Sequence, residues 1–305
     1  MTQSNDLSHL SENVRPQALL PDAVRVQLIL RPLFVEHTAI KFIMNELDWM
    51  LSNQSRRAPG LAVCAPPGSG KTELSMRVGR AYPPRQPGEG RLSVMPVVVI
   101  SMSGAYDMRT VYGRVMFALE VPCSERLTTT AREIQVLHLL RRVSCILLVL
   151  DEFQDISKGT DREQRRALDA VKLLMNQLNL PILALGTQEA GRALQSDAHL
   201  AARFSHTALP VWKKNAEFVA LLKAVHSQLP LRKPSSLTSD EVMQRLLTHS
   251  KGILGVIMRL LQDAAIHAII EGQEYIDVRM IDLAATRRPD YSVLKSAPDR
   301  DKKCA

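Results

Sequence analysis

Residues 65–72 combine the residue types that hold a phosphate group. An apolar stretch, Leu61 to Ala65, leads into a Pro- and Gly-rich loop, and a helical pattern follows from Glu73 to Arg80. Glycines let backbone N–H groups turn toward a phosphate, and the helix start adds positive potential. We therefore predict a strand, a phosphate loop and a helix, rather than a glycine-rich turn that precedes Lys-Thr by chance. The residues predicted to bind ATP here are Pro67, Gly68, Ser69, Gly70, Lys71, Thr72 and Glu73.

Two side chains of this loop have separate roles. Lys71 is expected to reach the β- and γ-phosphates, and the Thr72 hydroxyl is expected to ligate Mg²⁺. The usual pattern, G-x-x-x-x-G-K-[ST], has a glycine where this chain has Ala65. We expect a small residue to suffice at that position, because the last two glycines make the close approach to the phosphate.

A second acidic motif supports the first. The apolar run from Cys145 to Leu150 ends in Asp151-Glu152. A buried parallel strand delivers such carboxylates to the carboxyl edge of the sheet, where ligands bind in open α/β folds. Asp151 is predicted to hold Mg²⁺, directly or through water, and Glu152 to orient the attacking water.

The composition limits the classes of protein to which this chain can belong. The 305 residues carry a net charge of +8 and 46% hydrophobic residues, which suits a globular chain with a polyanionic partner. Four cysteines without paired spacing indicate free thiols, and the histidines form no zinc pattern. Neither a signal peptide nor a long apolar segment is present, so we expect a cytoplasmic protein without membrane contact.

Alternating strand and helix patterns indicate an α/β fold with a parallel five-stranded sheet flanked by helices. Strands are predicted at 61–65, 94–102, 145–150, 181–185 and 207–211, and helices at 22–51, 73–80, 107–119, 128–142 and 161–178. Helices alone follow, at 215–228, 239–249, 253–271 and 277–286, and predict a small helical lid. The expected organisation is a flexible arm (1–21), a nucleotide-binding domain (22–212), the lid (213–288) and a disordered tail (289–305).

Four further positions each have two interpretations. Val35, in the segment Arg31 to His37, contacts adenine or only packs. Thr187, after the fourth strand, contacts the γ-phosphate or only caps a helix. Arg203, with Arg192 in reserve, enters a neighbouring subunit's ATP site or lies on the surface. Arg259 reaches back to the nucleotide or is solvated on its helix.

In this order of motifs, the chain resembles an AAA+ ATPase and, more narrowly, the TniB family of transposition ATPases, which are related to TnsC. The resemblance runs from about Arg31 to Thr286, and its most telling segments are Arg31 to His37, Asp151 to Gln154 and Pro181 to Ala190. The chain departs from the commonest patterns at Ala65 and at Gln154, where histidine or asparagine is expected.

The resemblance implies a homo-oligomeric ring or filament that assembles on double-stranded DNA in its ATP form. It also implies recruitment of a DDE transposase, with a target-selection protein as a further partner. Arg203 would then act in trans, and duplex DNA would be held through its phosphates without base readout. Arg109 and Arg114 are the candidate DNA contacts, although solvation on the helix surface is the alternative for each.

Two other functions are compatible with the motifs. The first is a replication-initiator or helicase-loader ATPase. Initiators often carry an extra DNA-reading module after the lid, and the roughly 20 residues after Thr286 count against an initiator and less against a loader. The second is a nucleotide-binding scaffold that does not hydrolyse ATP at a useful rate. The intact Asp151-Glu152 pair argues against the scaffold.

Overall fold

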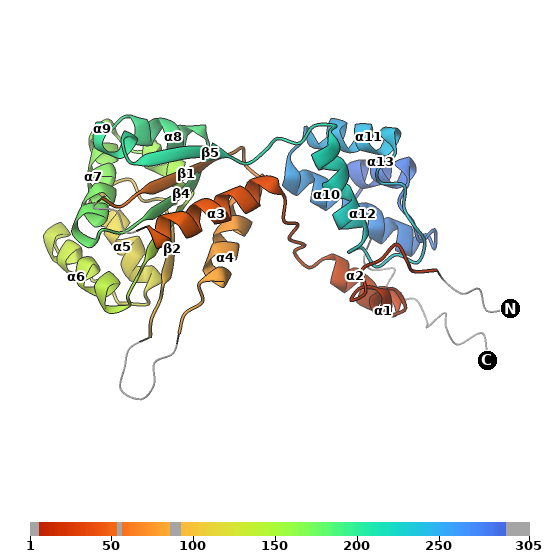
Figure 1. Ribbon diagram of the computed structural model, residues 1–305, viewed down its shortest axis with the longest axis horizontal. Helices are drawn as coiled ribbons and strands as arrows, with labels where there is room; N and C mark the ends of the chain where they lie inside the picture. The colour runs from red at the N-terminus through yellow and green to blue at the C-terminus, as the bar shows by residue number, and fades with distance from the viewer. Residues whose placement is uncertain (1–5, 54–56, 86–92, 291–305) are drawn as a thin grey trace. The chain divides into compact units, whose positions relative to one another are not determined.

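The computed structural model describes residues 6–53, 57–85 and 93–290, which form two compact units (Figure 1). One unit runs from Thr38 to Pro210, and we call it the sheet unit. The other joins the described residues before Thr38 to those after Pro210, and we call it the helical unit. Each unit has its own hydrophobic core.

The sheet unit is built on a five-stranded parallel sheet with the strand order β2-β3-β4-β1-β5. Every residue of β3 and β4 is buried, which explains why these strands appear in the sequence as unbroken apolar runs. Because all strands are parallel, their carboxyl ends meet at one edge, where the loops after β1, β3 and β4 lie together. The strands are β1 (Gly60–Cys64), β2 (Val97–Ser101), β3 (Leu147–Asp151), β4 (Ile182–Gly186) and β5 (Phe204–Ala208).

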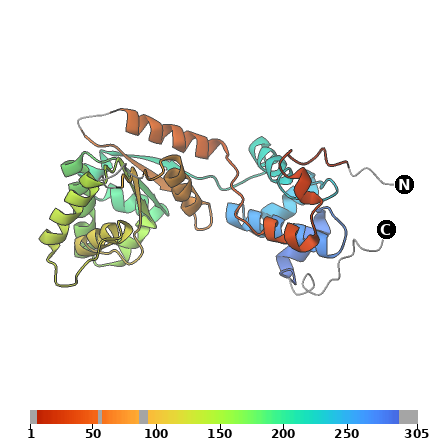
Figure 2. The same cartoon turned by 90° about the horizontal axis from the view of Figure 1, so that it is seen from below.

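Helices flank this sheet (Figures 1 and 2). Two of them begin with capping boxes, Asp107 with Thr110 and Thr160 with Glu163, which satisfy the first backbone N–H groups of each helix. The helices are α3 (Thr38–Ser52), α4 (Lys71–Ala81), α5 (Met108–Ala118), α6 (Thr129–Arg142), α7 (Asp161–Leu178), α8 (Gln188–Gln195) and α9 (Ala198–Ala201), with the 3-10 helix η1 (Phe153–Lys158) after β3. The predicted α/β class and parallel sheet are confirmed.

The fifth strand lies three residues earlier than predicted. It pairs Phe204 with Gly60, and a Cβ on Gly60 would lie 2.6 Å from the Phe204 ring. A side chain at position 60 would therefore displace the Phe204 ring, which packs directly on the Gly60 backbone. The polar residues Ser205 and His206 hid this strand from a search for apolar runs.

The helical unit consists of α1 (Arg15–Ala18), α2 (Asp22–Ile29), α10 (Ala216–His226), α11 (Asp240–Ser250), α12 (Leu254–Ile270) and α13 (Val278–Thr286). Its core combines Val26 and Ile29 from α2 with side chains from the C-terminal helices. The helix predicted over residues 22–51 is thus two helices, since Pro32 lies in the extended segment between them. Helix α2 belongs with the helical unit, which differs from the predicted domain boundary at residue 22.

The expected flexible N-terminal arm is instead packed on the helical unit. Leu10, Val14 and Ala18 are buried, and the Ser11 N–H donates to the Ser227 carbonyl at 3.0 Å. These apolar residues recur at four-residue spacing, so they line one face that the polar surroundings obscured. Residues 1–5 lie outside the described chain, as do residues 291–305 of the predicted disordered tail.

A buried ion pair joins α2 to the loop before α13. The Arg25 side chain is fully buried, and its guanidinium donates to both carboxylate oxygens of Glu274 at 2.7 Å and to Asp22 at 2.6 Å. Removing one partner of such a pair leaves the other charge buried and uncompensated.

We therefore expect Arg25→Ala to lower the free energy of unfolding of the helical unit by about 3–5 kcal/mol. Denaturant titration can follow the buried Trp212 of this unit in a Trp49→Phe background. The matched control is Lys223→Ala, because Lys223 is exposed on α10. Equal midpoints for the two variants would contradict the prediction.

Candidate functional site

The predicted phosphate loop joins β1 to α4 at the carboxyl edge of the sheet. Gly68 and Gly70 adopt left-handed backbone conformations, with φ of 77° and 93°, and Gly70 caps the eleven-residue helix α4. Ala65 does not have a positive φ, and its N–H donates to the Gly186 carbonyl at 2.9 Å. The position held by glycine in the usual pattern therefore has no need of glycine in this chain.

Lys71 is the first residue of α4, and its side chain reaches back into this loop. Its side-chain Nζ donates to the carbonyls of Ala65, at 2.9 Å, and Pro66, at 3.0 Å. Burial lowers the pKa of the Lys71 ammonium, against the opposing charges of Glu152 and Asp151. The buried Ser69 hydroxyl has no hydrogen-bond partner among the described residues. A buried cation and an unsatisfied hydroxyl at the start of α4 fit a phosphate group.

Asp151 and Thr72 meet at the same edge, from β3 and α4. The Glu152 N–H donates to the Asp151 carboxylate at 2.9 Å, and the Thr72 side chain is near enough to affect the same carboxylate. Burial raises the pKa of Asp151, and the Glu152 N–H and the Thr72 hydroxyl oppose that shift. The described residues contain no cluster of three or more His, Cys, Asp or Glu side chains suited to a metal. A hydroxyl beside a carboxylate nevertheless provides the oxygen ligands that Mg²⁺ prefers.

Glu152 follows in a strained backbone conformation, with φ of 56°. Its carboxylate accepts a hydrogen bond from the Gln154 amide Nε2, and the Gln154 Oε1 accepts from the Thr187 N–H at 3.2 Å. The structure thus links Glu152 to Thr187 through Gln154, which the sequence showed only as a departure from the family pattern. The position of Gln154, two residues after Glu152, was the only sequence signal for this contact.

The Thr187 side chain is engaged locally. Its hydroxyl donates to the Glu189 carboxylate, and it makes no side-chain hydrogen bond to cap α8. Thr187 directly follows β4, and β4 is the neighbour of β3 in the sheet. The residue is therefore placed beside the Asp151-Glu152 pair, whereas contact with a γ-phosphate stays a prediction.

Arg203 lies at the amino ends of the strands, opposite the carboxyl ends where the phosphate loop lies. Its carbonyl accepts from the Gly60 N–H at 3.0 Å, at the amino ends of β5 and β1. The five residues of β1, roughly 16 Å of extended chain, separate this position from the phosphate loop. Arg203 is thus remote from the phosphate loop of its own chain. The reserve candidate, Arg192, is exposed on α8.

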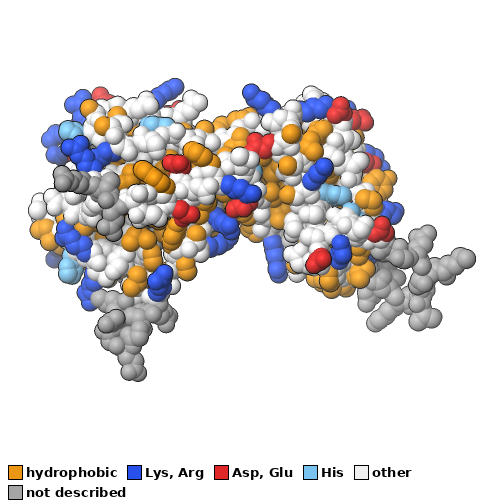
Figure 3. All heavy atoms as spheres, viewed as in Figure 1, with side chains coloured by type: hydrophobic (Ala, Val, Ile, Leu, Met, Phe, Trp, Pro, Cys, Tyr) orange, Lys and Arg blue, Asp and Glu red, His pale blue; other side chains and the backbone are white. Residues whose placement is uncertain are grey.

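Both candidate DNA contacts lie on α5 and bind backbone of their own unit. Arg109 donates to the Glu125 carbonyl, and Arg114 donates to the Ser103 carbonyl just after β2. Lys and Arg side chains occur on both units on the face shown in Figure 3. The DNA-binding roles of the two arginines stay predictions.

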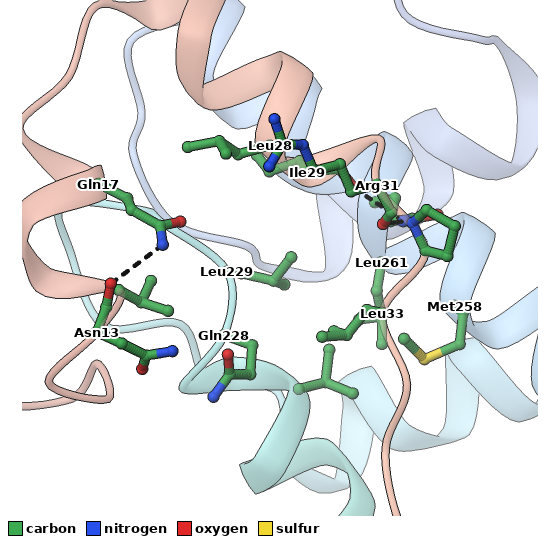
Figure 4. Close-up of a pocket in the computed structure, with 14 residues that line it drawn as sticks. Asn13, Gln17, Leu28, Ile29, Arg31, Leu33, Gln228, Leu229, Met258 and Leu261 are labelled. Atoms are coloured by element: carbon green, nitrogen blue, oxygen red, sulfur yellow. Dashed lines mark hydrogen bonds between the residues drawn. The ribbon is translucent and has the colours of Figure 1, made fainter. Parts of the chain in front are cut away.

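Val35 and Arg259 belong to the helical unit, so their approach to the phosphate loop also stays a prediction. Val35 packs against the core of that unit, and Arg259 Nη1 lies 3.5 Å from Asp263 Oδ2. The preceding segment, from Arg31 to Leu33, lines a cavity of about 190 Å³ together with Met258 and Leu261 (Figure 4). Val35 is not among the residues that line it.

Across the described ranges, no helix has both the length and the apolar character needed to cross a membrane.

Comparison with known proteins gives a family and a fold. The profile of the family described as bacterial TniB protein matches residues 25–214. No curated protein matches the chain.

Three solved structures are similar in fold. The ORC2 protein of Aeropyrum pernix, in ADPNP-ADP complexes, has a TM-score of 0.59 at 14% identity, covering 90% of this chain and 74% of that one. Cdc6p of Pyrobaculum aerophilum has a TM-score of 0.60 at 17% identity, with 88% and 74% covered. The A. pernix ORC1 protein in complex with DNA has a TM-score of 0.57 at 16% identity, with 86% and 68% covered. At these identities the likeness shows the fold alone, which is the AAA+ fold expected from the sequence.

Proposed function

The chain belongs to the TniB family, and from this premise we propose that it is an ATPase of DNA transposition that uses ATP as an assembly switch. In its ATP form it binds double-stranded DNA as a homo-oligomeric ring or filament, in the bacterial cytoplasm. There it recruits and activates a DDE transposase, with a target-selection protein as a further partner. The observation that carries this proposal is the meeting of Lys71, the Thr72–Asp151 pair and Glu152 at one sheet edge.

Each residue of this edge has a defined task. The loop from Pro67 to Glu73 surrounds the phosphates, which accept from its backbone N–H groups after Pro67 and from the Lys71 ammonium. Thr72 and Asp151 would hold Mg²⁺, which would supply charge neutralisation on the phosphate oxygens. Glu152 orients the attacking water and accepts its proton. Thr187 is the proposed contact of the γ-phosphate, and Val35 and Arg259 are the further proposed nucleotide contacts.

DNA binding is the second part of the proposal. The net charge of +8 favours a polyanionic partner, and one protein of similar fold was solved in complex with DNA. Arg109 and Arg114 extend from the helix that follows β2 and are the proposed phosphate contacts. Such contacts carry no sequence information, so binding should be non-specific and sensitive to salt.

The test is fluorescence anisotropy with a long random-sequence duplex, in a salt series, with a slowly hydrolysed ATP analogue, with ADP and without nucleotide. We expect tight binding only with the ATP analogue, stronger on longer duplexes and weaker as salt rises. Binding that is equal with ADP would contradict the switch.

Two other outcomes would redirect the assignment. Failure to bind duplex DNA in every nucleotide state and at every salt concentration would favour the protein scaffold that does not hydrolyse ATP. Binding confined to one DNA sequence would favour the replication-initiator alternative, because the proposed backbone contacts cannot select a sequence.

A further inference from the structure

We propose that Gln154 is a positioning residue for hydrolysis: its side-chain amide orients the Glu152 carboxylate and couples it to the end of β4 at Thr187. The inference rests on the proposed ATPase function and names a residue of the same site that the motifs do not assign. Gln154 lies in η1, directly after Glu152 and the fully buried Phe153.

The two ends of the amide have different partners, and these determine its orientation. The Thr187 N–H can only donate, so the group that faces it at 3.2 Å must be the Gln154 oxygen. The amide nitrogen then faces the Glu152 carboxylate, which accepts from it. A flipped amide would place its NH₂ group against the Thr187 N–H, donor against donor, and its oxygen against the Glu152 carboxylate, acceptor against acceptor. The network therefore admits one orientation.

The backbone at Gly186, at the end of β4, lies close to the Gln154 side chain. A Cβ on Gly186 would lie 2.8 Å from Gln154 Oε1 and 2.5 Å from the Ala190 Cβ. Gly186 therefore allows η1 to approach the end of β4 closely. Phe153 and Ile156, both fully buried, anchor η1 in the core on either side of Gln154. The amide is thus presented from a rigid support.

Glu152 needs such a partner. Its left-handed backbone is a strained conformation for a residue with a Cβ, and its half-buried side chain has several rotatable bonds. One hydrogen bond from Gln154 to Oε2 restricts these bonds, and the second carboxylate oxygen can accept a proton from water. Orientation of a general base by a fixed neighbour contributes to the rate without contributing to nucleotide affinity.

The first measurement is the steady-state kinetics of Gln154→Met, which keeps the length of the side chain and removes both the donor and the acceptor. We expect kcat to fall by about 10- to 100-fold, the effect of losing a hydrogen bond to a charged group. The KM for ATP and the affinity for a fluorescent ATP analogue should stay close to wild type. Gln177→Met is the matched control, because Gln177 is exposed in the last turn of α7.

A double-mutant cycle separates positioning from a general structural effect. If Gln154 acts through Glu152, Gln154→Met should lower turnover in the wild-type background and cause no further loss in Glu152→Gln. Single-turnover hydrolysis of labelled ATP is sensitive enough for the slow variants. A structural role would instead lower turnover by the same factor in both backgrounds.

Several results would overturn the inference. The first two are an unchanged kcat in Gln154→Met and a raised kcat; the latter would mean that the bond holds Glu152 away from water. The other two are equal losses of turnover in both backgrounds, and a loss of kcat accompanied by loss of analogue binding. Failure of the proposed function looks different: the wild-type chain would not hydrolyse ATP, or its turnover would survive Glu152→Gln.

Discussion

Arg203→Ala is expected to lower ATP turnover by about 10³-fold or more, with little change in nucleotide affinity, because an arginine that neutralises transition-state charge acts on the chemical step. We propose that Arg203 acts on another subunit, because its position is remote from the phosphate loop of its own chain. It lies at the amino end of β5, whereas the phosphate loop of the same chain lies at the carboxyl end of β1. The measurement is steady-state hydrolysis beside titration of a fluorescent ATP analogue.

Mixing two inactive variants tests the trans geometry directly. Arg203→Ala retains an intact phosphate loop and Glu152, while Glu152→Gln retains Arg203. In mixed oligomers, an Arg203→Ala subunit can receive the arginine of a Glu152→Gln neighbour, so we expect partial recovery of turnover. The matched control is Arg192→Ala, with the exposed reserve arginine of α8 changed. Full activity of Arg203→Ala, or loss in Arg192→Ala alone, would reassign the role.

Lys71→Met should weaken ATP binding by about 100-fold or more, since two charge-assisted hydrogen bonds to phosphates contribute about 1.5–3 kcal/mol each. In the structure the Lys71 ammonium is buried in the phosphate loop, where it already donates to two loop carbonyls. Methionine keeps the length of the side chain and removes the charge. Titration with the fluorescent ATP analogue measures the loss.

The same variant should lose the difference in DNA binding between the ATP-analogue and ADP states. Lys41→Met is the matched control, because Lys41 is exposed on α3 of the same unit. Circular dichroism of both variants distinguishes lost affinity from lost folding. If Lys71→Met bound the analogue as tightly as Lys41→Met, the phosphate role of Lys71 would be excluded.

The sheet unit was predictable because its signals are local. Fully buried parallel strands require unbroken apolar runs, and the loop after β1 requires glycines where its backbone has positive φ, at Gly68 and Gly70. Asp151 was predictable for the same reason, since a strand end determines which edge of the sheet a carboxylate reaches. Sequence alone therefore determined the α/β class, the phosphate loop and the acidic pair.

Only the tertiary structure decided the contacts between residues far apart in the chain. Ser11 pairs with Ser227, and Arg25 with Glu274, so the polar N-terminal segment becomes part of the helical unit. The bridge from Glu152 through Gln154 to Thr187 depends on the adjacency of β3 and β4. These outcomes depend on strand order, on close approach at Gly60 and Gly186, and on burial of charge. None of these has a local signature, because each is a property of surfaces that meet only after the chain has folded.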